Sequence, residues 1–379
     1  MKIRATHCIT GKAVELEVRQ KKLVAVRTLP GRLRNGIYAG PGLTDLQVNG
    51  YNGIDFNTAP LDAADVRRVS DALVQAGVTR FFPTVITNST DRIISLLESI
   101  DRACREDPGL VDHIPGIHLE GPFVSPDDGA RGAHSADYVT APDRALFDRF
   151  QKAARGKIRI ITLSPEWKGS SSFIKRCVRL GVVVSIGHTN ATPEQIQEAI
   201  RAGATMSTHL GNGAPLMLPR HPNFIWEQLA SDALTACIIA DGFHLPPAFI
   251  KTVLRAKKNN TILVSDCTMF AGMKPGIYSS HIGGRVRLDT TGRLCMDSDP
   301  RMLAGAALAL TRGIDHLINE QLATLQQAWS MASLQVNNTM GIPNGTRDPF
   351  AGDMVIFERK SNGIHIKTVF RSRRLVYAA

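Results

Sequence analysis

Eight short apolar segments, separated by stretches of helical periodicity, constrain the fold of this chain most strongly. The apolar segments are residues 42–48, 80–86, 114–119, 158–163, 182–186, 204–208, 236–240 and 261–264. Helix-like stretches between them include residues 63–76, 87–105, 143–154, 171–180 and 193–202, the last with Thr192 as N-cap ahead of Pro193. This alternation is typical of βα units around a parallel sheet. The sequence therefore predicts an α/β fold, a (β/α)8 TIM-like barrel, whose chemistry takes place at the carboxyl ends of the strands.

The two ends of the chain have a different pattern. Residues 13–19 and 22–28 read as short strands, and residues 353–357 and 363–370 do so at the other end. We expect the ends to pair in a small β-sandwich domain, built from residues 1–41 and 345–379. The catalytic barrel, residues 42–344, would then be inserted between the two halves of that domain.

Polar side chains follow six of the predicted barrel strands at matching places. They are Asp45, Gln47 and Asn49 on the first strand, Glu120 on the third, His188 on the fifth, His209 on the sixth, His244 after the seventh and Asp266 after the eighth. A lone histidine is usually a satisfied core residue, but a set at successive strand ends favours a site. Glu120, His188 and His209 make a plausible three-ligand metal site with an open position for water.

Composition excludes several classes of function. No apolar run reaches the ~18 residues of a membrane helix, and residues 1–8 lack the apolar core of a secretory signal, so we expect a cytoplasmic protein without membrane contact. The six cysteines form no CxxC pair, which argues against a disulfide framework or a cysteine zinc site. The net charge of +11 is spread out rather than clustered. That distribution favours an anionic small substrate over nucleic acid.

Seven motifs in order carry a family resemblance. They are PGLTDLQVNG (41–50), HLEGPF (118–123), GHTNA (187–191), THL (208–210), DGFH (241–244), SD (265–266) and AGMKPGIY (271–278). Over nearly its whole length, the chain resembles the N-acetylglucosamine-6-phosphate deacetylase family of the amidohydrolase superfamily. The implied reaction is hydrolysis of the acetamide of N-acetylglucosamine 6-phosphate to glucosamine 6-phosphate and acetate.

The resemblance also implies a metal site. Glu120, His188 and His209 would bind one divalent ion per subunit, Zn²⁺ first, with Fe²⁺, Mn²⁺ and Co²⁺ as alternatives. Gln47 and Asn49 stand where many superfamily members carry a His-x-His pair for a second metal. Because amides are poor zinc ligands, we expect a single ion.

The remaining implied roles concern catalysis and substrate. Asp266 would act as general base toward the attacking water and then pass the proton to the departing amine, although an N-cap role is the structural alternative. The substrate contacts would be Ala133, His134, Asn212, Gly213, Arg220, His244, Leu303, Ala304 and Gly305. Arg220 suits a phosphate because its planar donors bind two oxygens at once. In the family the equivalent arginine reaches into the neighbouring subunit, which implies a homodimer.

One loop departs from the family pattern. Residues 211–214, Gly-Asn-Gly-Ala, lack the aromatic and thioether side chains usual after the second histidine, and Phe224 and Trp226 could refill that space. Alternative functions therefore stay open. The chain could act on another N-acyl amino sugar, such as N-acetylgalactosamine 6-phosphate or an unphosphorylated sugar, or on an N-acyl amino acid. A non-catalytic binding protein on the same fold is the third alternative.

Overall fold

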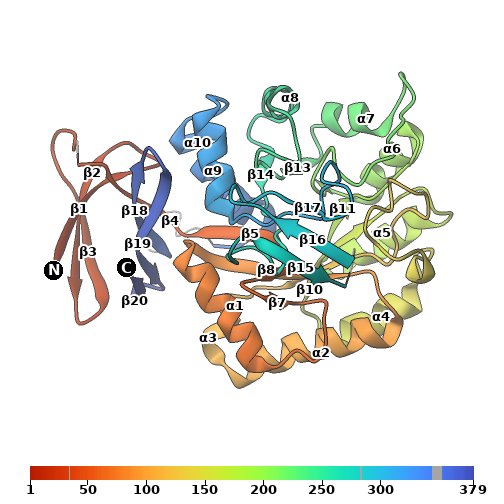
Figure 1. The fold of residues 1–379 in the computed structure, drawn as a ribbon, viewed down its shortest axis with the longest axis horizontal. Coiled ribbons are helices and arrows are strands. Elements are labelled where there is room, and N and C mark those ends of the chain that lie inside the picture. Colours follow the sequence, from red (N-terminus) through yellow and green to blue (C-terminus); the bar gives the residue numbers. More distant parts are fainter. Residues whose placement is uncertain (34, 282–283, 344–351) are drawn as a thin grey trace.

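The larger part of the molecule is a barrel of eight parallel strands (Figure 1). The structure is a computed structural model that describes residues 1–33, 35–281, 284–343 and 352–379. In order around the barrel, the strands are β5 (Leu43–Val48), β8 (Val78–Ile86), β9 (Ile117–Glu120), β10 (Ile158–Leu163), β11 (Val183–Ile186), β12 (Met206–Ser207), β13 (Thr235–Ile238) and β14 (Thr261–Leu263). Each follows its predecessor in sequence and pairs with it in parallel. The predicted (β/α)8 barrel is confirmed.

The barrel closes where β5 meets the segment after β14. The backbone N–H of Asn49 donates to the carbonyl of Cys267 at 2.9 Å, and Ser265 donates through its hydroxyl to the carbonyl of Gln47 at 3.3 Å. Ser265 also donates its backbone N–H to the carboxylate of Asp45 at 3.1 Å. This closing seam places Asp266 beside the carboxyl end of the first barrel strand.

Helices cover the outside of the barrel. They are α1 (Ala63–Gln75), α2 (Thr90–Glu106), α3 (Pro108–Val111), α4 (Arg144–Ala153), α5 (Ser170–Arg179), α6 (Pro193–Ala202), α7 (Phe224–Ala230), α8 (Pro247–Lys257), α9 (Leu310–Asn319), α10 (Leu325–Met331) and α11 (Leu334–Met340), with a 3₁₀ turn at Ala136–Tyr138. The five helices expected from the sequence are present. Helix α6 begins at Pro193, as predicted, because Thr192 and Gln195 form a reciprocal capping box. No helix in the described ranges is long and apolar enough to cross a membrane.

The small domain is one sheet of seven strands built from both ends of the chain. Its strands are β1 (Lys2–His7), β2 (Ala13–Arg19), β3 (Lys22–Thr28), β4 (Ile37–Pro41), β18 (Met354–Lys360), β19 (Gly363–Arg371) and β20 (Arg374–Ala378). The sheet closes on itself in the order β1-β2-β3-β20-β19-β18-β4. Strand β4 joins the two halves, since it pairs with β1 on one side and with β18 on the other. The predicted small β domain from both ends is confirmed as a feature of the fold, while the proposed boundary at residues 344–345 lies outside the described residues.

A buried tryptophan connects the two parts. Trp329, on α10, stacks on Phe357 of β18 with ring centroids 4.1 Å apart and planes within 5°. Its indole N–H donates to the carbonyl of Pro41 at 2.9 Å, at the end of β4. An apolar stack and a hydrogen bond at this residue therefore help to hold the small domain against the barrel.

Two small antiparallel sheets were not expected from the sequence. One is the pair β6 (Gly50–Tyr51) and β7 (Ile54–Asp55), and the other contains β15 (Gly276–Ser280), β16 (Gly284–Leu288) and β17 (Leu294–Met296). Ala304 donates its N–H to Leu294 at 3.1 Å, and Ala306 accepts from the N–H of Thr268 at 2.9 Å. These bonds tie the three-stranded sheet to the segment that carries Asp266.

Candidate active site

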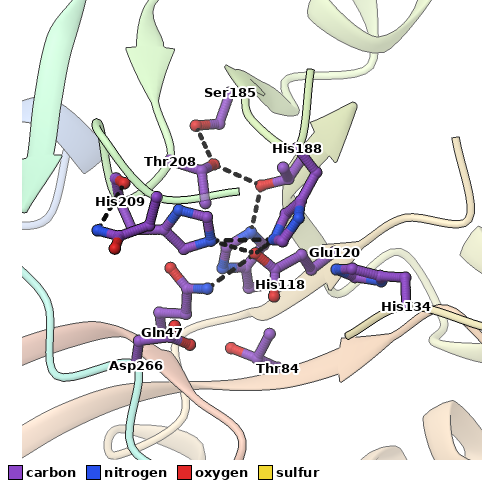
Figure 2. A network of polar contacts seen from close by, with 12 residues as sticks. Gln47, Thr84, His118, Glu120, His134, Ser185, His188, Thr208, His209 and Asp266 are labelled. Carbon is purple, nitrogen blue, oxygen red and sulfur yellow. Dashed lines mark hydrogen bonds and ion pairs between the residues drawn. The ribbon is translucent and has the colours of Figure 1, made fainter. Parts of the chain in front are cut away.

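Three potential metal ligands converge at the carboxyl end of the barrel (Figure 2). Glu120 is the last residue of β9, while His188 and His209 lie two residues beyond β11 and β12. Oε1 of Glu120 is 3.5 Å from Nε2 of His188 and 3.2 Å from Nε2 of His209, and the two Nε2 atoms are 3.1 Å apart. All three side chains are buried.

The spacing of these three atoms fits a metal ion. Ligands bound to a tetrahedral zinc ion at roughly 2.0–2.1 Å lie about 3.3–3.4 Å from one another. The three separations in this site, 3.1, 3.2 and 3.5 Å, bracket that value. Three protein ligands, two imidazoles and one carboxylate, leave a coordination position for water or substrate.

The surroundings of His188 fix which of its nitrogens faces the site. Nδ1 of His188 lies 3.1 Å from the carbonyl oxygen of Ala130, which can only accept, so the proton is on Nδ1 and the lone pair of Nε2 is free. Two glycines flank the ring. A Cβ atom at Gly213 would lie 2.7 Å from Nδ1 of His188, and one at Gly132 would lie 3.2 Å from its Cε1. Gly213, expected to contact substrate, therefore makes room for the histidine ring.

Three site residues share an unusual backbone conformation. His188, His209 and Asp266 have φ values of 49°, 25° and 50°, in the left-handed region that non-glycine residues seldom adopt. Such conformations cost about 1–3 kcal/mol each and concentrate at functional sites. This strain falls on three of the positions that the strand-end pattern indicated.

The charges within this group stabilise one another. Burial disfavours a charge on Glu120, but the closeness of His188 and His209 outweighs that effect and holds its pKa well below the usual value. Burial likewise lowers the pKa of His209, yet its contact with Glu120 raises the pKa overall. Glu120 is therefore a carboxylate at neutral pH, the form that binds a metal ion.

The two amides of the first strand hold the two acids of the site. Gln47 donates through Nε2 to Oε1 of Glu120 at 2.9 Å, and Asn49 donates through Nδ2 to Oδ1 of Asp266 at 2.7 Å. An amide binds a metal through its oxygen, and here each amide turns its nitrogen toward the acid. At these two positions the chain carries hydrogen-bond donors, whereas a second metal would require ligands.

Asp266 has the environment of a general base. Its pKa is raised to about 6, first by desolvation and then by the negative charge of Glu120. The hydrogen bond from Asn49 opposes this rise because it favours the charged form. Nearby, Nδ1 of His244 lies 2.7 Å from Oδ2 of Asp241, which orients the imidazole. Asp266 is thus ionised at neutral pH but remains easily protonated.

His134 lies close to two of the three potential metal ligands. It is 5% exposed, its Nδ1 is 2.7 Å from the hydroxyl of Thr87, and its ring centroid is 4.3 Å from that of His188. Ligand atoms of Glu120, His134 and His188 all lie within 4.8 Å of one another. Burial, and then the proximity of His188, lower the pKa of His134 to about 3, so the ring stays neutral.

A chain of hydroxyl groups beside the potential ligands was not identified from the sequence. Nε2 of His118 is 2.7 Å from the hydroxyl of Thr162, which is 2.6 Å from that of Thr208, which in turn is 2.6 Å from that of Ser185 (Figure 2). His118 shares the inward face of β9 with Glu120, two residues away. That period-two spacing is the signal that could have identified it.

The other residues predicted to contact substrate lie in several different surroundings. Asn212 donates through its backbone and its side chain to the carbonyl of His209, at 2.9 and 3.2 Å. Ala133 and Arg220 are exposed. Leu303, Ala304 and Gly305 form the strand-like link beside Thr268, where a Cβ atom at Gly305 would lie 2.9 Å from the threonine methyl group.

The two aromatic residues considered as pocket walls have different environments. Phe224 is 4% exposed and packs in the main core, whereas Trp226 is 51% exposed. Arg220 shares its loop with Leu216 and Met217, which are 97% and 86% exposed. This loop therefore presents apolar and basic groups to solvent.

The family comparison agrees with the geometry. The model of the Amidohydrolase family matches residues 38–364. The N-acetylglucosamine-6-phosphate deacetylase of Bacillus subtilis is 34% identical over 73% of this chain and 69% of its own length. The enzyme of the same name from Homo sapiens is 30% identical over 91% of this chain and 84% of its own length.

Solved structures show the same architecture. The N-acetyl-D-glucosamine-6-phosphate deacetylase from Mycobacterium smegmatis superposes with a TM-score of 0.85 at 25% identity, covering all of both chains. A 5-methylcytosine deaminase from Klebsiella pneumoniae, 12% identical, gives a TM-score of 0.60 and shares the fold alone. The chain belongs to the N-acetylglucosamine-6-phosphate deacetylase family of amidohydrolases.

Proposed function

We propose that this protein is a deacetylase that hydrolyses the acetamide of N-acetylglucosamine 6-phosphate to glucosamine 6-phosphate and acetate. The observation that carries the proposal is the convergence of Glu120, His188 and His209 within 3.1–3.5 Å, with Asp266 at the same barrel mouth. Relatives at 30–34% identity are N-acetylglucosamine-6-phosphate deacetylases, which supports the substrate.

We assign one divalent ion per subunit to Glu120, His188 and His209, with Zn²⁺ as the first choice and Fe²⁺, Mn²⁺ or Co²⁺ as alternatives. The donors contributed by Gln47 and Asn49 support a single ion. When bound, the ion supplies Lewis acidity, which polarises the amide carbonyl and acidifies water.

The residues of the chain provide the proton transfers. Asp266, held through Oδ1 by Asn49, accepts a proton from the water that attacks the acetamide carbon. The water oxygen forms the new C–O bond, and Asp266 then returns the proton to the amide nitrogen as the C–N bond breaks. The products are acetate and the free amine. A carboxyl group with a pKa of about 6 suits both steps, because it can take and release a proton near neutral pH.

We propose that Arg220 binds the 6-phosphate across the interface of a homodimer. Arg220 is exposed and forms no ion pair with another described residue. The exposed Leu216 and Met217 on the same loop support burial against a partner, because large apolar groups gathered on a surface mark interaction sites.

The function is tested by measuring acetate release from N-acetylglucosamine 6-phosphate and from the unphosphorylated sugar. We expect clear preference for the phosphorylated substrate in the wild type and a selective loss of that preference in Arg220→Ala. The exposed Arg201 on α6 offers a matched control, and Arg201→Ala should behave as wild type. Equal rates on both substrates would contradict the phosphate assignment. Absence of turnover by the metal-loaded protein would contradict the deacetylase assignment.

A further inference from the structure

Three buried hydroxyl groups lead, one after another, to the ring of His118 (Figure 2). Nε2 of His118 lies 2.7 Å from the hydroxyl of Thr162. The hydroxyl of Thr208 lies 2.6 Å from that of Thr162 and 2.6 Å from that of Ser185. All four side chains are at most 3% exposed. On the other side of the ring, Nδ1 of His118 lies 3.0 Å from the carbonyl oxygen of Leu46. We call the three hydroxyl groups the hydroxyl chain.

The hydrogen bonds of the hydroxyl chain point in one direction. A carbonyl can only accept, so the proton of His118 is on Nδ1, and burial lowers the pKa of the ring, which leaves Nε2 as an acceptor. Thr162 therefore donates its single hydroxyl hydrogen to His118. Its bond with Thr208 then requires Thr208 to donate, and Ser185 in turn donates to Thr208. The tautomer of one histidine thus sets the direction of the whole hydroxyl chain.

The hydroxyl chain connects strands that carry potential metal ligands. His118 is two residues before Glu120, on the same face of β9. Thr208 directly precedes His209. Thr162 lies on β10, which contributes no ligand of its own. Its hydroxyl therefore joins the strand of the carboxylate to the strand of one histidine.

The second histidine is matched to the same group of side chains through Gly187, which directly precedes His188. A Cβ atom at Gly187 would lie 2.7 Å from Cβ of Thr208 and 3.0 Å from Cγ2 of Thr162. The first separation is shorter than packed atoms allow, so a larger residue at this position would push the threonines away. Ser185 adds a hydrogen bond from the same strand, β11. The hydroxyl chain thus reaches all three strands that lead to the ligands.

We propose that His118 and the hydroxyl chain are positioning residues, which hold the three potential metal ligands at the separations that an ion requires. The inference rests on the proposed function, from which it takes the ligands. Barrel interiors are usually filled by branched apolar side chains, and buried hydroxyl groups are costly unless each is bonded. A buried network whose bonds are all made is rigid. Rigidity at this place is useful, because the ligand atoms lie only 3.1–3.5 Å apart.

Thr162 is the residue that tests the proposal, because it lies in the middle of the network and on a strand without a ligand. Thr162→Val keeps the shape of the side chain but leaves His118 without a donor and Thr208 without an acceptor. Competition with a chelator measures the affinity for Zn²⁺. We expect Thr162→Val to bind Zn²⁺ about 10-fold more weakly, the lower end of the effect of losing an outer partner of a ligand. Thr162→Ser, which keeps the hydroxyl, should restore the wild-type affinity.

The direction of the hydrogen bonds gives a second expectation. Ser185→Ala removes only the last donor and leaves the two bonds nearest His118 in place, so its effect on Zn²⁺ affinity should be the smallest. Thr208→Val should have an intermediate effect, and Thr162→Val the largest. Packing alone would give no such order, because exchange of threonine for valine hardly changes the volume. Thr208→Val also provides the test if Thr162→Val does not fold.

Thr79→Val is the matched control. Thr79 is a fully buried threonine near the amino end of β8, and its hydroxyl donates to the carbonyl of Leu43 at 3.4 Å. Its replacement should lower the free energy of unfolding of the metal-free protein and leave the affinity for Zn²⁺ unchanged. Stability and ligand positioning are thereby measured separately.

Two results would overturn the proposal. One is a folded Thr162→Val protein that binds Zn²⁺ as tightly as the wild type, and the other is a Thr162→Ser protein that binds it as weakly as Thr162→Val. Both leave the wild type able to bind Zn²⁺ and release acetate. Failure of the proposed function is therefore distinguishable, since in that case the wild type itself would bind no Zn²⁺ or release no acetate.

Discussion

Gln47 donates a hydrogen bond of 2.9 Å to Oε1 of Glu120, the same carboxylate oxygen that faces both His188 and His209. The amide therefore holds the carboxylate in the rotamer that meets the histidines. A side chain expected only to occupy the place of a second metal's ligand instead holds the carboxylate that we assign to the first ion.

Replacing Gln47 tests that support. Gln47→Leu removes the donor and puts an apolar side chain in its place, and loss of such a partner typically costs about 10–100-fold in metal affinity or activity. Competition between Zn²⁺ and a chelator measures the effect. Gln151→Leu, which removes an amide from helix α4 on the outside of the barrel, serves as control. Unchanged Zn²⁺ affinity in Gln47→Leu would show that the bond is dispensable.

Glu120→Gln should lose the metal and the activity together. Glutamine keeps the shape of the side chain but removes the negative charge that His188 and His209 stabilise, and a neutral amide is a poor ligand. Elemental analysis and acetate release measure the two losses on the same sample. A Glu120→Gln protein with full metal occupancy and normal turnover would rule out this ligand set.

Asp266→Asn should retain metal and substrate binding but lose proton transfer. Asparagine keeps the size of the side chain and cannot accept the proton from water. Loss of a single proton-transfer group costs about 100-fold to 10,000-fold in rate, so kcat should fall at least that far. Steady-state kinetics with parallel metal analysis check both statements. Turnover within a few-fold of the wild type would mean that the proton goes elsewhere.

Activity should fall as the pH drops through the pKa of Asp266. The base works only when deprotonated, so kcat/KM should decline about tenfold per pH unit on the acid side of a pKa no higher than about 6, since a bound cation can only lower that value. Asn49→Ala removes a hydrogen bond that favours the charged form, and the acid limb should therefore move to higher pH. A pH–rate profile of both proteins decides the matter. If the acid limb of the Asn49→Ala profile lies at the same pH as in the wild type, a group other than Asp266 governs the pH dependence.

The free energy of unfolding should depend on Trp329, which contacts both the barrel and the small domain. Trp329→Phe keeps the stack on Phe357 but loses the bond to Pro41, at a cost of about 1 kcal/mol in the free energy of unfolding. Trp329→Ala also leaves a cavity and should cost about 3–5 kcal/mol. Chemical denaturation measures both changes, while metal affinity at the distant barrel mouth should stay constant. Equal stabilities of the two variants would show that the stack contributes little.

The barrel was predictable because strands buried on both faces are short, nearly continuous apolar runs. Helix α6 was predictable to the residue because Thr192, Pro193 and Gln195 specify its start chemically. The sheet of β15–β17 was missed, since β16 exposes Arg285 and Arg287 and carries little apolar signal.

The site was predictable where strands position its side chains. The carboxyl ends of parallel strands meet at one edge, so the approach of Glu120, His188 and His209 follows from their places in the chain. The bond between Asn49 and Asp266 depends on closure of the barrel between its first and last strands, which no local pattern encodes. His134 comes from a loop, where no periodicity fixes the direction of a side chain.

Strand β4 has a consequence for the order in which the molecule folds. It pairs with β18, where Pro41 lies opposite Met354, so one half of the small sheet is synthesised before the barrel and the other half after it. Contacts between such distant parts of a chain form slowly, whereas each barrel strand pairs with one that precedes it closely. Until β18, β19 and β20 emerge, β3 and β4 present unpaired edges, the kind of edge that invites aggregation. The strands synthesised after the barrel therefore cover the edges left open by the strands synthesised before it.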